Sequence, residues 1–126
     1  MEAVQIKYHI QLDDLDFMEI VSHYKWIQLC ERFRTKIFKE RYKKLLKDGL
    51  GVVIADLTVK YKRPAVYDQE VVFEISVLES KVSSAIVRHR ALDKDQKELM
   101  IADIRLVCID ETKRAVPMPD YFISES

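Results

Sequence analysis

The stretch SHYKWIQLCERFRTKIFKERYKKLLK at residues 22–47 predicts one long amphipathic helix. Ser22 can cap its start, and Gly49 and Gly51 follow its end, where glycine commonly terminates helices. No other segment keeps helical spacing over such a length. The apolar residues that recur at helical spacing are Trp26, Ile27, Cys30, Phe33, Ile37, Phe38, Leu45 and Leu46. An apolar face of this size has to be covered by a second layer.

Five strand patterns surround this helix and can supply that layer. One precedes it at Val4–Leu12, where apolar and polar residues alternate. Four follow it, at Val52–Arg63, Val71–Val77, Val82–Leu92 and Leu99–Ile109. The last of these is nearly all apolar, which is typical of a central strand covered on both faces. The tail from Pro117 is expected to be extended.

The order of these patterns predicts the fold class. Short links between the last four strands favour antiparallel pairing. We therefore expect an α+β fold in which a five-stranded antiparallel sheet wraps around one long central helix, with residues 1–126 forming a single domain. The other face and the edges of the sheet would need a partner, so a homodimer or homotetramer is expected.

Charge and cysteine content exclude several classes of function. Lys plus Arg and Asp plus Glu number 21 each, so no basic excess indicates a nucleic-acid partner. No apolar run is long enough for membrane insertion and no signal peptide is evident, so a cytoplasmic location is expected. Cys30 and Cys108 lie in apolar segments and are expected to be buried free thiols. Without a Cys/His cluster, no metal site is expected.

The segment DLDFMEIVSHYKW at residues 14–26 resembles the signature of the 4-hydroxybenzoyl-CoA thioesterase family, including its YbgC-like acyl-CoA thioesterases. Three later segments also resemble motifs of that family, in the same order. They are Glu31-Arg32-Phe33-Arg34-Thr35, Tyr61-Lys62-Arg63-Pro64-Ala65 followed by Tyr67-Asp68, and Val116-Pro117-Met118-Pro119. The resemblance covers nearly the whole chain. No single motif is specific for the family, but the four motifs in this order are.

The resemblance implies a hotdog fold with active sites at a dimer interface. It implies that Asp16 is the catalytic carboxylate and that His23 corresponds to the histidine of the family's Tyr-His pair. It also places the thioester carbonyl at the start of the helix, around His23. Without the resemblance, Asp16 would be an ordinary loop acid.

The residues themselves are suited to thioester hydrolysis. The first turn of a helix offers unpaired N–H groups that can stabilise an oxyanion. A carboxylate just upstream can attack the carbonyl to give a mixed anhydride, or it can deprotonate water. The sequence leaves both routes open for Asp16, and neither needs a metal or organic cofactor. The substrate would be an acyl-CoA or an acyl-carrier-protein thioester.

Several other residues are candidates for binding the substrate. Tyr24 is expected to line the acyl pocket. Lys60, Lys62 and Arg63 can hold the phosphates of CoA, although solvated strand positions are the alternative for each. Asp14 is assigned to turn structure. His9 and His89 fall on strand faces that we interpret as polar, and no role is assigned to either.

Four positions depart from the family's pattern. Glu19 stands where the family has Gly, Ser22 where it has Tyr, Lys25 where it has Asn, and Trp26 where it has Tyr. A small residue at position 19 would let the backbone approach the substrate closely. Glu19 therefore changes that turn or adds a second acid to the site.

These departures keep two alternatives to acyl-CoA hydrolysis open. One is a thioesterase acting on a polyketide or fatty acyl group linked to a carrier protein. The other is a catalytically silent hotdog domain that binds acyl groups or serves as an assembly module.

Overall fold

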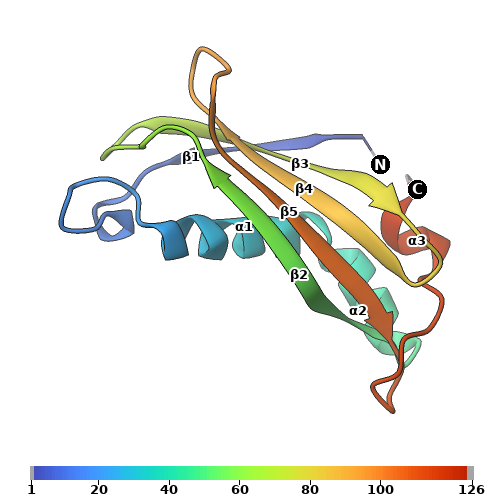
Figure 1. The fold of residues 1–126 in the computed structure, drawn as a ribbon. Helices are drawn as coiled ribbons and strands as arrows, with labels where there is room; N and C mark the ends of the chain where they lie inside the picture. The colour runs from blue at the N-terminus through green and yellow to red at the C-terminus, as the bar shows by residue number, and fades with distance from the viewer. Residues whose placement is uncertain (1, 125–126) are drawn as a thin grey trace.

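The computed structural model describes residues 2–124 and confirms the predicted α+β architecture (Figure 1). A five-stranded antiparallel sheet of order β1-β3-β4-β5-β2 curves around helix α1. The elements are β1 (Val4–His9), the 3-10 helix η1 (Leu12–Asp14), α1 (His23–Ile37), α2 (Lys39–Lys47), β2 (Gly51–Tyr61), β3 (Glu70–Ser80), β4 (Ser84–Leu92), β5 (Glu98–Ile109) and α3 (Asp120–Ile123). No helix in the described part of the chain is long and apolar enough to cross a membrane.

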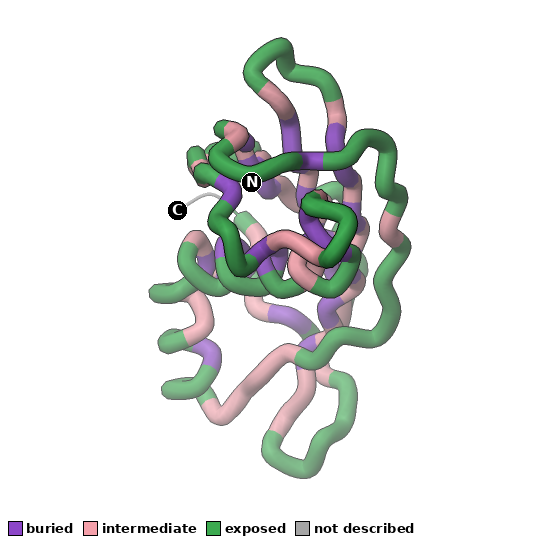
Figure 2. The backbone as a smooth tube through the Cα atoms, turned by 90° about the vertical axis from the view of Figure 1, so that its left-hand side faces the viewer, coloured by how far each residue is buried: buried purple, intermediate pink, exposed green. Residues whose placement is uncertain are grey.

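The core lies between α1 and the inner face of the sheet. The ring of Phe73 on β3 lies 4.9 Å from that of Phe33 and 5.9 Å from that of Trp26, measured between ring centroids. In Figure 2 the buried segments gather where the helix and the sheet face each other, and the hairpin tips are exposed. Cys30 and Cys108 are buried free thiols, as predicted.

The prediction of one continuous helix is wrong, because the helical segment is divided in two. The chain leaves helical geometry at Phe38, where φ is −93° and ψ is 9°, so that α1 and α2 are separate helices. Phe38 is fully buried, and its ring lies 5.3 Å from that of Phe122 on α3. The predicted extended tail is wrong from Asp120 onward, because residues 120–123 form a short helix that brings Phe122 into this aromatic cluster. Burial of these rings decides both features, and it depends on residues far apart in sequence.

Two apolar residues that are predicted to be in strands lie outside them. β1 stops at His9, and Leu12 starts η1 with 72 % of its surface exposed. β4 starts at Ser84, and Val82 lies exposed in the hairpin before it. Each of these apolar residues fits the alternation of the adjacent strand, but it lies in a turn beside that strand and faces solvent.

β5 pairs with both β4 and β2, but only one of its faces is buried. Ala102, Ile104 and Leu106 point into the core, whereas Asp103 and Arg105 lie on the outer face. Arg88 of β4 donates two hydrogen bonds to the Asp103 carboxylate, at 2.8 and 2.9 Å. The prediction of a strand covered on both faces is therefore wrong.

A row of polar side chains crosses the outer face of the sheet. The Gln5 amide and the Arg90 guanidinium both donate to Glu74, at 3.2 and 2.7 Å. Arg90 and Lys62 in turn both donate to Glu98, at 2.8 and 2.6 Å. Such partly exposed pairs contribute only about 0–1 kcal/mol each. They place a charge-balanced polar row on this face, beside half-buried apolar residues such as Ile86, Ile101 and Val107.

His89 contradicts the expectation of a polar strand face. It shares the inner face of β4 with Val87 and Ala91 and is fully buried. Arg34, itself buried on α1, donates from Nη1 to His89 Nε2 at 3.2 Å, so Nδ1 carries the proton and donates to the Ala102 carbonyl at 3.2 Å. Burial and the nearby Arg34 charge lower the pKa of His89 to about 4. With both ring nitrogens bonded, the neutral imidazole is tolerated in the core.

Candidate active site

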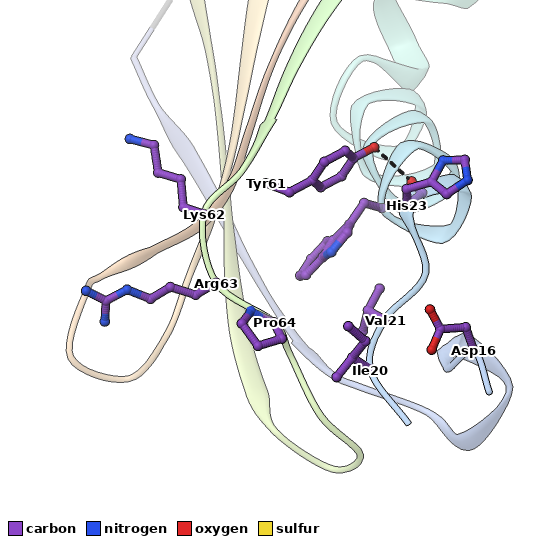
Figure 3. Close-up of a pocket in the computed structure, with 9 residues that line it drawn as sticks. Asp16, Ile20, Val21, His23, Tyr61, Lys62, Arg63 and Pro64 are labelled. Atoms are coloured by element: carbon purple, nitrogen blue, oxygen red, sulfur yellow. Dashed lines mark hydrogen bonds between the residues drawn. The ribbon is translucent and has the colours of Figure 1, made fainter. Parts of the chain in front are cut away.

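A cleft of about 430 Å³ opens between the start of α1, the end of β2 and the loop that follows η1 (Figure 3). Its lining residues are Asp16, Ile20, Val21, His23, Trp26, Tyr61, Lys62, Arg63 and Pro64. Two of the motifs found in the sequence meet here although they lie about forty residues apart. The backbone N–H of Val21 donates to the Ala65 carbonyl at 2.9 Å, which joins them directly.

Asp16 sits at the base of a tight turn. Leu15 and Val21 form an antiparallel bridge, Asp16 N–H donates to the Ile20 carbonyl at 2.9 Å, and Glu19 N–H donates to the Asp16 carbonyl at 3.0 Å. The Asp16 carboxylate also accepts a bond from Met18 N–H, at 2.8 Å to Oδ1. Oδ2 takes part in no hydrogen bond found within residues 2–124. The turn therefore holds the carboxylate at the cleft through a single oxygen.

Glu19 occupies the left-handed region of backbone space, with φ of 63°. Residues 17–19 form a three-residue loop between Asp16 and Ile20. The last residue of such a loop is usually left-handed and is commonly glycine. Its side chain is exposed and does not line the cleft. Glu19 thus keeps the turn that a glycine would make, at the expense of some backbone strain.

Replacing Glu19 by Gly is expected to stabilise the protein. Left-handed geometry costs a residue with a Cβ about 1–2 kcal/mol, and the greater freedom of Gly in the unfolded chain offsets about 0.5–1 kcal/mol of that. The net gain in the free energy of unfolding should be about 0.5–1 kcal/mol, measured by urea denaturation. As a control, Glu31→Gly on the exposed face of α1 should lose about 1 kcal/mol. Equal losses in both variants would contradict the strain at Glu19.

Helix α1 starts at His23, with Ser22 at the N-cap position as predicted. The Ser22 hydroxyl caps no backbone group, however, and its buried Oγ has no hydrogen-bond partner within residues 2–124. The N–H groups of His23, Tyr24 and Lys25 likewise donate to no carbonyl or side chain in the described chain. These are the free donors that the first turn of any helix presents. His23 brings that turn to the cleft.

Tyr61 and Trp26 belong to the cleft although we expected no functional role for either. The Tyr61 hydroxyl, at the end of β2, donates to the His23 backbone carbonyl at 3.2 Å (Figure 3). Trp26 is only 3 % exposed, yet it lines the cleft as well as the core. Strand alternation could have indicated that Tyr61 faces the helix, because Lys60 and Lys62 then face the opposite side.

The cleft gathers four of the seven residues predicted for the site. Asp16, His23, Lys62 and Arg63 line it, whereas the other three do not. The side chains of Lys62 and Arg63 extend away from Asp16 (Figure 3), and Lys62 is paired with Glu98. Those outside the lining are Glu19, Tyr24 and Lys60. Of these, Tyr24 is 60 % exposed, and its ring lies edge-on to the His23 ring.

Known proteins resemble this chain in sequence. Residues 10–124 match the family model described as the thioesterase-like superfamily. The chain is 24 % identical over 114 residues to the acyl-CoA thioester hydrolase YbgC of Escherichia coli, covering 86 % of this chain and 85 % of that protein.

Solved structures share the fold. A DHNA-CoA thioesterase from Staphylococcus aureus superposes with a TM-score of 0.83 at 19 % identity, covering 97 % of this chain and 85 % of that one. Another S. aureus protein, solved in complex with CoA, superposes with a TM-score of 0.87 at 7 % identity, covering 96 % and 79 %. These likenesses and the family match confirm the hotdog fold and the resemblance found in the sequence. The chain belongs to the thioesterase-like superfamily.

Proposed function

We propose that this protein is an acyl-CoA thioesterase that hydrolyses an acyl thioester to the free acid and CoA. The observation that carries the proposal is that a carboxylate, Asp16, and the free N–H groups of a helix start, at His23, border one cleft in a chain of this superfamily. The relative named an acyl-CoA thioester hydrolase and the structural neighbour solved with CoA support the same choice of substrate.

The chemistry follows from the two halves of the cleft. The thioester carbonyl oxygen would accept hydrogen bonds from the first turn of α1, where one donor is typically worth about 2.7–4 kcal/mol of transition-state stabilisation. Asp16 would either attack the carbonyl carbon or remove a proton from the attacking water. In the first route the CoA thiolate leaves, and water then cleaves the mixed anhydride and restores the carboxylate. In the second route the tetrahedral intermediate collapses and expels the thiolate.

Among the basic residues, Arg63 is the best candidate to contact a phosphate of CoA. Its side chain extends from the rim of the cleft into solvent (Figure 3). Lys62 already holds an ion pair with Glu98 at 2.6 Å, and Lys60 lies on the outer face of β2. A phosphate contact by Lys62 would have to replace its ion pair with Glu98, and Lys60 does not line the cleft.

A thiol-release assay tests the proposal, using CoA thioesters with short, long and aromatic acyl groups. We expect release of CoA from at least one of these classes. Thermal stabilisation by an acyl-CoA without thiol release would indicate the silent acyl-binding alternative instead. Release from a carrier-protein thioester but from none of the CoA thioesters would indicate the carrier-linked alternative.

We also propose that the protein associates through β2. This strand is an edge of the sheet, and it carries Val53, Ile54 and Leu57 with 45, 47 and 44 % of their surfaces exposed. Exposed apolar edge strands readily pair with another chain. The edge is therefore the surface that we expect a second copy to cover.

Ile54→Lys is expected to convert the assembly into monomers, because an unpaired buried charge at an interface typically costs several kcal/mol. Sedimentation velocity across a protein concentration series would measure the change. Val82→Lys is the matched control, since Val82 is 74 % exposed in a hairpin away from this edge. A monomeric wild-type protein, or an unchanged assembly in Ile54→Lys, would contradict association through β2.

A further inference from the structure

A second carboxylate, Asp14, lies beneath the turn that carries Asp16. It is only 2 % exposed and does not line the cleft. Its Oδ2 accepts hydrogen bonds from the Tyr8 hydroxyl at 2.5 Å and from Gln11 N–H at 2.8 Å. Its Oδ1 lies 3.7 Å from Nζ of Lys25, whose side chain is 15 % exposed. A buried acid with this many partners does more than form a turn.

The partners of Asp14 come from three separate parts of the chain around the Asp16 turn. Tyr8 belongs to β1, Gln11 precedes η1, and Lys25 lies in the first turn of α1. The Asp14 backbone carbonyl also accepts a bond from Ser22 N–H at 3.2 Å. Asp14 therefore ties the start of the turn to the start of the helix, the two structures that face each other across the cleft.

The Tyr8 phenol and the Lys25 ammonium are suited to hold the Asp14 carboxylate in place. Burial and the hydrogen bond to Asp14 raise the pKa of Tyr8 to about 12, so the phenol stays a donor. A buried carboxylate is costly unless it is paired and hydrogen-bonded. Lys25 supplies the cation, at a position where the family resemblance has Asn.

We infer that Asp14, Tyr8 and Lys25 form a positioning unit that holds the Asp16 carboxylate against the start of α1. The inference rests on the proposed function, because it gives Asp16 its role. Asp14 does not line the cleft, so it acts through Leu15, the one residue between it and Asp16 in the chain. Lys25 acts in the same way on the helix side, two residues after His23.

Tyr8→Phe and Lys25→Met test the inference, with steady-state kinetics on an acyl-CoA that the wild-type protein hydrolyses. A misplaced catalytic group raises the barrier more than it weakens substrate binding, so kcat should fall by about 10- to 100-fold while KM changes by less than about three-fold. Lys25→Arg keeps the cation and should retain kcat within about three-fold of wild type.

Tyr121→Phe is the matched control. It also removes a tyrosine–aspartate hydrogen bond, from Tyr121 to Asp48 at 2.7 Å, but at the far end of α2 from the cleft. Its kcat should equal that of wild type. An equal fall of kcat in Tyr8→Phe and Tyr121→Phe, following their losses of thermal stability, would overturn the positioning role.

The failure of this inference differs from the failure of the proposed function. If Asp16→Asn retains full turnover, the proposed function is wrong. If Asp16→Asn is inactive while Tyr8→Phe and Lys25→Met both keep wild-type kcat, only the positioning unit is wrong. A fall in kcat for Lys25→Met that Lys25→Arg restores supports the unit even if Tyr8→Phe does not fold.

Discussion

Asp16→Asn is expected to lower kcat for acyl-CoA hydrolysis by about 10²- to 10⁴-fold, the range typical for the loss of a catalytic acid or base. The amide is a poor nucleophile and a poor base, so both routes open to Asp16 are lost. The variant should fold normally, because an amide oxygen can still accept the bond that Met18 N–H donates to Asp16. Thiol release under saturating substrate, together with a thermal unfolding curve, separates lost chemistry from lost structure.

Asp13→Asn provides the control for this variant. Asp13 is an exposed acid in η1, three residues away, and it does not line the cleft. Its replacement should leave kcat and KM unchanged. Full turnover by Asp16→Asn, or an equal loss in Asp13→Asn, would contradict the assignment of Asp16.

The second large effect concerns stability in acid and depends on His89. The unfolded chain binds a proton at His89 near the ordinary pKa of about 6.5, whereas the folded protein binds it only near pH 4. Between these values the unfolded state binds more protons, so the free energy of unfolding falls as the pH falls. His89 contributes fully above pH 6.5 and loses its contribution by pH 4, a change of roughly 3 kcal/mol.

His89→Gln should remove this part of the pH dependence. Glutamine does not titrate, and its amide can accept from Arg34 and donate to the Ala102 carbonyl as the imidazole does. Urea denaturation at pH 7.5 and 4.5 measures the difference. His9→Gln is the control, because more than half of the His9 side chain is exposed. A pH dependence that is identical in wild type and His89→Gln would show that burial of this histidine does not couple folding to pH.

The architecture could be predicted from periodicity along the chain. The alternation at Val71–Val77 and the helical spacing at Trp26–Phe33 can each be read from neighbouring residues of a single strand or helix. The short links were enough to predict antiparallel pairing, but not the strand order, since β2 pairs with β5 and not with β3. Recognition of the Asp16 segment depended on resemblance, since a lone loop acid has no such periodicity.

The errors have a shared physical cause. Phe38 fits a helical stripe, but the helix is interrupted there and the buried ring packs against Phe122. His89 looked polar by residue type, yet Arg34 and Ala102 satisfy both of its ring nitrogens inside the core. In each case a partner from a distant segment overrides the local pattern.

Resemblance to a family singled out the carboxylate at position 16. Periodicity along the sequence determined the order of the main helical segment and the five strands, and which faces of α1 and β3 are buried. Those properties are local, because side-chain spacing repeats within each helix and strand. Only the tertiary structure decided that Tyr61 reaches the first turn of α1 and that Asp14 joins β1 to that helix. Hydrogen bonds between residues that are far apart along the chain require the fold to be in place before their partners meet.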